Sequence, residues 1–121
     1  MKKVVVTGGY GFIGSNLIRL LLKKNYFVIN IDKISYSSNF YNLKNIDNKN
    51  YIFIKTDINN KSIISSTIKK YKPSIIFNLA AETHVDRSID GPEPFIHSNI
   101  NGVFNLLECI RSYNKKSRTK I

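Results

Sequence analysis

The glycine-rich turn at residues 8–14 constrains the fold of this chain more than any other feature of its sequence. The β-branched run Val4-Val5-Val6 before the turn is typical of a strand that is buried on both faces. Apolar residues after the turn recur at the spacing of one helix face: Ile13, Leu17, Leu20 and Leu21. We therefore predict a strand, a tight turn and an amphipathic helix, in that order.

The same alternation of short β-rich runs and helical runs continues along the chain. Strands are predicted at residues 4–7, 27–32, 51–55 and 74–79. Helices are predicted at residues 12–24 and 61–71, and residues 33–50 are expected to form a loop with one helical turn. A third helix should follow Pro92 and Pro94 and run to about Ser112. Its expected apolar stripe consists of Phe95, Val103, Leu106, Leu107 and Ile110.

Strands and helices that alternate at this spacing favour parallel strands joined by right-handed crossovers. The predicted fold class is therefore α/β, with a doubly wound, Rossmann-like parallel sheet. In the usual strand order of that fold, 3-2-1-4, the run at residues 74–79 forms an open edge. A length of 121 residues allows one domain at most.

Charge and composition exclude several classes of partner. The net charge of +11 would favour nucleic acid, but the basic residues look scattered along the sequence. No arginine-rich stripe, zinc-ligand spacing or aromatic RNA-binding signature accompanies them, so we expect neither nucleic acid nor a metal. Without a secretory signal or an apolar run of about 20 residues, we expect no membrane partner and a cytoplasmic location. Cys109, the only cysteine, is expected to be a small buried residue.

The glycine spacing indicates a phosphate-binding turn. Residues 9–14 fit G-x-G-x-x-G, and Gly8, Gly11 and Gly14 fit the variant G-x-x-G-x-x-G. Such glycines let the backbone approach a pyrophosphate, and the following helix offers free N–H groups. Asp32, at the end of the next predicted strand, can accept hydrogen bonds from both ribose hydroxyls. The pattern predicts an NAD site, and a glycine turn without a ligand is the alternative.

Two neighbouring features leave alternatives open. The Asp32 carboxylate would repel the 2′-phosphate of NADP, whereas Lys33 beside it could hold a phosphate. Asp57 follows the third predicted strand, where it could accept a hydrogen bond from an adenine amino group. On spacing alone, Asp57 could equally be an acid at a helix N-terminus.

Five segments carry a family resemblance: "TGGYGFIG", "DKISYSSN", "DI", "NLAAETHVDRSIDGPEPF" and "SNINGVFNLLE". In this order and spacing the chain resembles the dTDP-glucose 4,6-dehydratases, which are extended short-chain dehydrogenase/reductases of the NAD-dependent epimerase/dehydratase family. The glycine motif and "NLAA" are common to that superfamily, whereas "HVDRS" and the "DKISYSSN" pattern point to its nucleotide-sugar dehydratase branch. The resemblance covers essentially the whole chain.

The resemblance implies a lyase that holds NAD tightly and uses it as a transient hydride acceptor. Its substrate would be the nucleotide sugar dTDP-glucose, and its product dTDP-4-keto-6-deoxyglucose. The implied setting is the synthesis of deoxysugars such as rhamnose for cell-surface polysaccharide, and the full-length protein is expected to be a homodimer. UDP-sugar epimerases and GDP-mannose-type dehydratases share the cofactor half and remain alternatives, as does a non-catalytic NAD-binding module.

Site residues follow from the resemblance, position by position. It implies these cofactor-binding residues: Gly8, Gly11, Phe12, Ile13, Gly14, Asp32, Lys33, Ile34, Ser35, Asp57, Ile58, Leu79, Ala80, Ala81, Glu82, Thr83 and Ser98. Thr83 would also contact the hexose. The chain departs from the family at Ser37-Ser38, where Ala-Gly is more usual, at Asn101, which replaces an apolar residue, and at His97, where an acid is common. His97 has no assigned role. His84, Asp86 and Arg87 could shape the substrate pocket, but a structural role is expected for them.

No catalytic residue is expected among residues 1–121. In the family, a Thr-Asp-Glu group and a Tyr-x-x-x-Lys pair lie beyond the matching position. We therefore expect these residues to be the N-terminal part of an NAD-binding domain, without the substrate domain. Residues 117–121 are interpreted as the start of a fifth strand.

Overall fold

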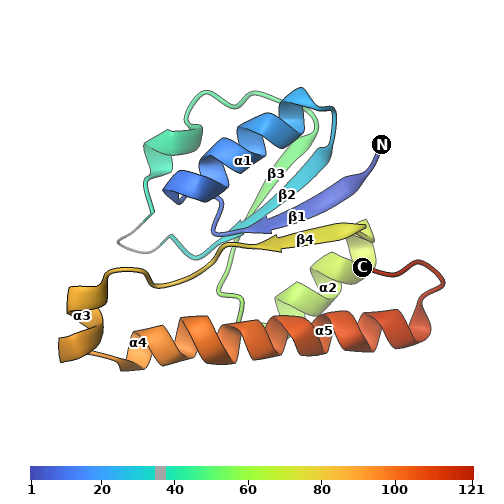
Figure 1. Ribbon diagram of the computed structural model, residues 1–121. Helices are drawn as coiled ribbons and strands as arrows, with labels where there is room; N and C mark the ends of the chain where they lie inside the picture. Colours follow the sequence, from blue (N-terminus) through green and yellow to red (C-terminus); the bar gives the residue numbers. More distant parts are fainter. Residues whose placement is uncertain (35–37) are drawn as a thin grey trace.

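Four parallel strands form one sheet with helices on both faces in the computed structural model, which describes residues 1–34 and 38–121 (Figure 1). The strands are β1 (Lys3–Thr7), β2 (Phe27–Asp32), β3 (Tyr51–Lys55) and β4 (Ile75–Asn78). Their order is β3-β2-β1-β4, which places β4 at one edge. Within the sheet, Val5 pairs with Ile29 of β2 and Ile76 of β4. The predicted α/β class and strand order are both confirmed.

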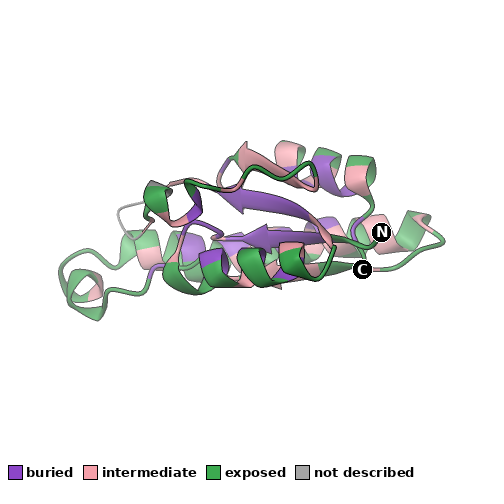
Figure 2. Cartoon of the chain, turned by 90° about the horizontal axis from the view of Figure 1, so that it is seen from above, coloured by how far each residue is buried: buried purple, intermediate pink, exposed green. Residues whose placement is uncertain are grey.

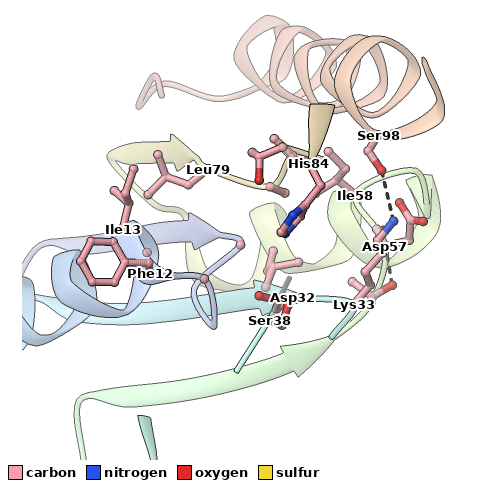
Figure 3. A pocket seen from close by; sticks show the side chains of 18 residues that line it. Phe12, Ile13, Asp32, Lys33, Ser38, Asp57, Ile58, Leu79, His84 and Ser98 are labelled. Atoms are coloured by element: carbon pink, nitrogen blue, oxygen red, sulfur yellow. Dashed lines mark hydrogen bonds between the residues drawn. The ribbon is translucent and has the colours of Figure 1, made fainter. Parts of the chain in front are cut away.

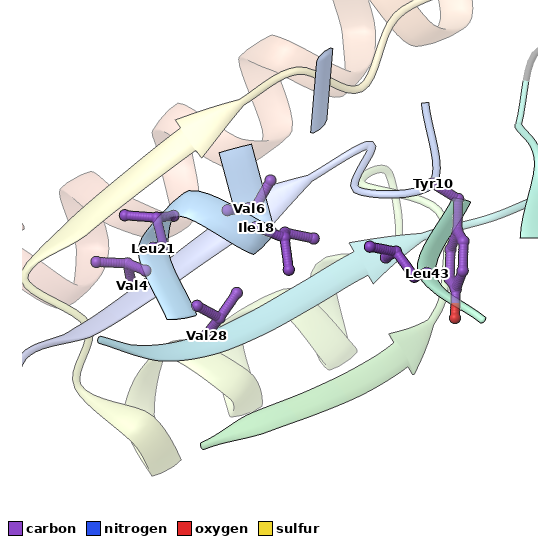
Figure 4. Close-up of a cluster of buried hydrophobic side chains, with 7 residues drawn as sticks. All are labelled: Val4, Val6, Tyr10, Ile18, Leu21, Val28 and Leu43. Atoms are coloured by element: carbon purple, nitrogen blue, oxygen red, sulfur yellow. The ribbon is translucent and has the colours of Figure 1, made fainter. Parts of the chain in front are cut away.

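Each face of the sheet has its own layer of helices. Helix α1 (Phe12–Lys23) and the 3-10 turn η1 (Phe40–Leu43) cover one face, and α2 (Lys61–Tyr71) and α5 (Val103–Lys116) cover the other (Figure 1). Alternate residues of β1 supply both cores, because successive side chains of a strand point to opposite faces. The first core surrounds Val4 and Val6 (Figure 4), and the second surrounds Val5. The central strands are consequently buried, while the outer helix faces are exposed (Figure 2).

The buried face of α1 agrees only in part with the predicted one. Ile13 is 68% exposed and Leu20 is 49% exposed, so both lie outside the core. Leu21 is buried and Leu17 packs against the first core, as predicted, and the helix also buries Gly14 and Ile18. The reason is the close approach of Gly14 to the carbonyl oxygen of Gly8, which any Cβ at Gly14 would prevent. This contact turns the Gly14 face toward the sheet.

The third predicted helix is longer and less regular than expected. It begins as α4 (Glu93–Ile96), continues as a π-helical segment η2 (His97–Gly102), and runs through α5 to Lys116 instead of ending near Ser112. Because a π-helical turn holds more residues than an α-helical turn, it shifts which later side chains face the sheet. Leu107, expected in the buried stripe, is 58% exposed, whereas Leu106 and Cys109 are buried. The burial of Cys109 is as predicted.

Two shorter segments also differ from expectation. A short helix, α3 (Val85–Asp90), precedes the proline-containing helix start and was not predicted. Residues 117–121 do not form a strand. They fold back onto α5 instead, where the backbone N–H of Ile121 donates to the Asn114 side chain at 3.0 Å. None of the helices in the described part of the chain is long and apolar enough to span a membrane.

The basic residues are not scattered in space, contrary to the interpretation of the sequence. Strand starts and helix ends share one edge of the sheet, which we call the amino edge (Figure 1). Exposed cations gather there: Lys2, Lys3, Lys23, Lys24, Lys49, Lys69, Lys70, Lys72, Lys115, Lys116, Arg118 and Lys120. Most acids lie at the opposite, carboxyl edge: Asp32, Asp57, Glu82, Asp86, Asp90 and Glu93. Helix dipoles favour cations at helix C-termini, which explains part of this separation.

Candidate functional site

The loops that follow the four strands surround a cavity of about 500 Å³ at the carboxyl edge (Figure 3). This is where parallel α/β sheets bind their ligands, because the chain diverges to either side of the sheet there. The cavity is lined by Gly8, Gly11, Phe12, Ile13, Gly14, Ile31, Asp32, Lys33, Ser38, Thr56, Asp57, Ile58, Leu79, Ala80, Ala81, Thr83, His84 and Ser98.

Fourteen of the predicted cofactor-binding residues lie around this one cavity, and two others that the structure describes do not. Ile34 packs against the first core, and Glu82 is buried outside the lining. Ser35 lies outside the described residues, as does Ser37. Three lining residues were not predicted from the sequence: Ile31, Ser38 and Thr56. His84, for which a structural role was expected, also lines the cavity. Ile31 and Thr56 directly precede the two predicted acids, so the strand ends could have indicated them, whereas Ser38 and His84 depend on loop conformation.

The glycine turn lets three backbone segments approach each other closely at one end of the cavity: the turn itself, the start of α1 and the loop after β4. Gly8 has a φ of +70°, and a Cβ there would lie 2.7 Å from the backbone of Leu79. Gly11 is the N-cap of α1, which therefore has no side-chain cap, and the first turn of α1 contains no acid. No side chain of α1 itself therefore neutralises the positive end of the helix dipole or accepts a hydrogen bond from the first N–H groups. This arrangement suits a ligand phosphate.

Asp32 connects the glycine turn to the loop after β2. Its side chain accepts hydrogen bonds from the backbone N–H of Tyr10 at 2.9 Å and of Ile34 at 2.7 Å. The Ser38 hydroxyl donates to it at 3.3 Å. Ile34 has a φ of +59°, which is unfavourable for a β-branched residue, and its bond to Asp32 helps to hold it there. A carboxylate has about four acceptor positions, so Asp32 can still accept a bond from a ligand hydroxyl.

Asp57 lies across the cavity and does not cap α2. The side chain of Asn60 is the cap, since it accepts a hydrogen bond from Ile63 N–H at 3.2 Å. Burial by itself raises the pKa of Asp57, but the hydrogen bonds from Asn59 and the charges of Lys33 and His97 bring this pKa below its usual value. Asp57 is therefore an ionised acceptor beside Ile58.

Lys33 bridges three elements at the far side of the cavity. Its Nζ lies 3.4 Å from Glu82 Oε1 and donates to Ser98 Oγ at 3.1 Å. The Asn99 side chain fixes the backbone of Glu82, because it accepts from the N–H at 2.8 Å and donates to the carbonyl at 2.9 Å. The π-helical segment η2, which holds Ser98 and Asn99, is thereby tied to the loop after β4.

This geometry agrees with a comparison of the sequence with known families. Residues 5–121 match the sequence model of the GDP-mannose 4,6 dehydratase family. The chain belongs to that family.

Individual members of the dehydratase and epimerase group are similar to this chain along most of its length. A dTDP-glucose 4,6-dehydratase from Haemophilus influenzae is 45% identical over 115 residues, which are 93% of this chain and 34% of that protein. The crystal structure of dTDP-glucose 4,6-dehydratase from Bacillus anthracis in complex with NAD has a TM-score of 0.82 at 37% identity, covering 93% of this chain and 34% of that one. The structure of UDP-glucose 4-epimerase from Thermotoga maritima with UDP-glucose has a TM-score of 0.83 at 33% identity. This match covers 92% of this chain and 34% of the epimerase chain. The chain spans about a third of the length of these family members.

Proposed function

We propose that this chain is the NAD-binding part of a nucleotide-sugar dehydratase that acts on dTDP-glucose. The observation that carries the proposal is the cavity between the uncapped start of α1 and the Asp32 carboxylate. Relatives named dTDP-glucose 4,6-dehydratase, at 43–45% identity, support the reaction class. In this proposal the 121 residues bind the cofactor, and the family's Thr-Asp-Glu and Tyr-x-x-x-Lys groups act from a part that this sequence does not contain.

The chain's own groups suit the successive parts of NAD. Backbone N–H groups at the start of α1 would hold the pyrophosphate, and Asp32 would accept from the adenosine ribose. The ionised Asp57 would accept from the adenine amino group. Residues on the nicotinamide side would be Leu79, Ala80, Ala81 and Thr83, and Ser98 would be a further contact of NAD. NAD supplies the hydride acceptor that oxidation of the sugar requires.

Thr83 is proposed to position the hexose. It is exposed at the cavity rim in the loop after β4, where its hydroxyl is available to a ligand. In the full-length enzyme, Thr83→Val should lower kcat with little change in NAD affinity, because the side-chain shape is kept and one hydrogen bond to the sugar is lost. Steady-state kinetics and NAD titration measure the two effects. Unchanged kcat and KM would contradict a sugar contact.

The reaction itself can be tested by joining residues 1–121 to the remaining two thirds of the Haemophilus influenzae relative. Such a chimera should convert dTDP-glucose to the 4-keto-6-deoxy product and should leave UDP-glucose without epimerisation. A matched chimera with Asp32→Ala should bind NAD less tightly. Epimerase activity would assign the chain to the epimerase alternative, and a parent chain that does not bind NAD would refute the proposed function.

The full-length protein is further proposed to be a homodimer, which makes its deoxysugar product for rhamnose-containing cell-surface polysaccharide. The dimer is supported by apolar side chains on the outer face of α4, η2 and α5, away from the sheet. We call Ile96, Ile100, Phe104 and Leu107 the outer stripe, and they are 49–66% exposed. Continuous apolar surface of this kind is typical of an interface.

A further inference from the structure

We propose that Glu82 helps to select NAD over NADP by holding Lys33 away from the position that a 2′-phosphate would occupy. The inference rests on the proposed NAD site and adds a selectivity determinant that does not touch the ribose. Glu82 acts here as a positioning residue, through Lys33.

The positive charge of Lys33 could reduce the preference of the site for NAD over NADP. It directly follows Asp32, whose carboxylate repels a 2′-phosphate. Among the described residues that line the cavity, Lys33 has the only lysine or arginine side chain. A flexible ammonium group beside the ribose position would neutralise the extra phosphate of NADP and offset the effect of Asp32.

The structure shows where this ammonium group is held instead. Lys33 Nζ pairs with Glu82 Oε1 at 3.4 Å and donates to Ser98 Oγ at 3.1 Å. Figure 3 shows the Lys33 side chain extending toward Ser98, while the Asp32 carboxylate lies beside Ser38. Lys33 is thus directed to the helix side of the cavity.

Glu82 has a physical reason to keep this partner. Its side chain is only 4% exposed, and its Oε2 atom has no hydrogen-bond partner among the described residues. Because a buried carboxylate is costly without a cation, release of Lys33 would leave an unpaired buried charge. Asn99 also holds the Glu82 backbone by two hydrogen bonds, which limits how far Glu82 can move outward with Lys33. A 2′-phosphate must therefore compete with Glu82 for Lys33.

Neutralising Glu82 tests this competition. Glu82→Gln keeps the side-chain shape and removes the charge, so Lys33 should become available to NADP. We expect NADP to bind roughly five- to tenfold more tightly, as for a charge-assisted contact at a partly exposed site, with less than a twofold change for NAD. Calorimetric titration of the chimera with the Haemophilus influenzae relative, carrying the parent or the variant residue, gives the affinities for NAD and for NADP.

The matched control is the double variant Glu82→Gln/Lys33→Met, in which the gain for NADP should disappear. Glu82→Asp shortens the acid while keeping its charge, so it should shift the ratio in the same direction if Glu82→Gln does not fold. The inference is overturned if the ratio of the NAD affinity to the NADP affinity is unchanged in the folded Glu82 variant. It is also overturned if the NADP affinity of the double variant rises as much as that of Glu82→Gln. Failure of the parent chimera to bind NAD would instead refute the proposed function, so the two failures are distinguishable.

Discussion

Asp32 has a structural task in addition to its proposed contact with ribose. It accepts hydrogen bonds from the backbone N–H groups of Tyr10 and Ile34 and is only 6% exposed. Loss of this carboxylate leaves two donors without their partner. We therefore expect Asp32→Ala to lower the free energy of unfolding by about 1.5–3 kcal/mol even without a ligand.

Urea denaturation of the unliganded protein measures this effect. Asp47→Ala, at an exposed acid, is the matched control and should change the stability by less than about 0.5 kcal/mol. Equal stability of the two variants would mean that Asp32 does not hold the glycine turn.

Asp57 should make the stability of the protein depend on pH at the acid end. Its folded-state pKa is lowered because the hydrogen bonds of Asn59 and the charges of Lys33 and His97 outweigh burial. A carboxyl group whose pKa is lowered on folding stabilises the protein above its unfolded pKa, near 4. This stabilisation is lost as the pH falls through the lower, folded-state value.

Thermal melting from pH 6 down to pH 3 compares the parent with Asp57→Asn. The melting temperature of the parent should fall further over this pH range than that of the variant, because the Asn side chain does not take up a proton. Parallel curves would contradict a lowered pKa at Asp57.

At the scale of secondary-structure elements, α5 has two apolar faces with different environments. Leu106 and Cys109 pack against the sheet and α2, whereas Phe104 of the outer stripe is 66% exposed. In Phe104→Glu, a charge replaces the centre of the outer stripe, so the variant should dissociate a dimer of the full-length protein. Since Phe104 is exposed, the unfolding free energy of the monomer should change by less than about 0.5 kcal/mol.

Sedimentation analysis over a range of concentrations gives the oligomeric state. Ser112→Glu introduces the same charge at an exposed position on a different face of α5 from Phe104 and Leu107, so this control should leave a dimer intact. A dimer that tolerates Phe104→Glu would show that some other surface, or another part of the longer chain, covers the stripe.

At the scale of the whole molecule, the cations of the amino edge repel one another. The net charge of +11 is distributed unevenly, and salt screens the interaction of exposed charges beyond about 10 Å at 0.1 M ionic strength. Raising the salt concentration from 10 to 300 mM should therefore stabilise the protein by about 1 kcal/mol, or about 4 °C in melting temperature.

Two variants of α2 locate the source of this effect. Lys69→Gln removes a cation at the amino edge and should weaken the salt dependence. Lys61→Gln, at the opposite end of the same helix, should leave the dependence nearly unchanged. If stability depends equally on salt concentration in the two variants, the repulsion is not concentrated at the amino edge.

The sequence by itself determined the strands, the glycine turn and the position of Asp32. A doubly buried strand needs a β-branched run, and a backbone that approaches another within van der Waals distance needs glycine. These requirements are local, so Val4-Val5-Val6, Gly8 and Gly14 show them in the sequence.

Only the tertiary structure decided the buried faces of α1 and α5, the pairing of Lys33 with Glu82, and the separation of charge between the two edges. A helical apolar pattern with residues on more than one face does not indicate which face meets the sheet, because the glycine contact and the π-helical turn set the rotation. Lys33 and Glu82 come from loops after different strands, and nothing in either segment identifies the other as its partner. Such features arise from the relative placement of distant segments, which the packing of the whole chain sets.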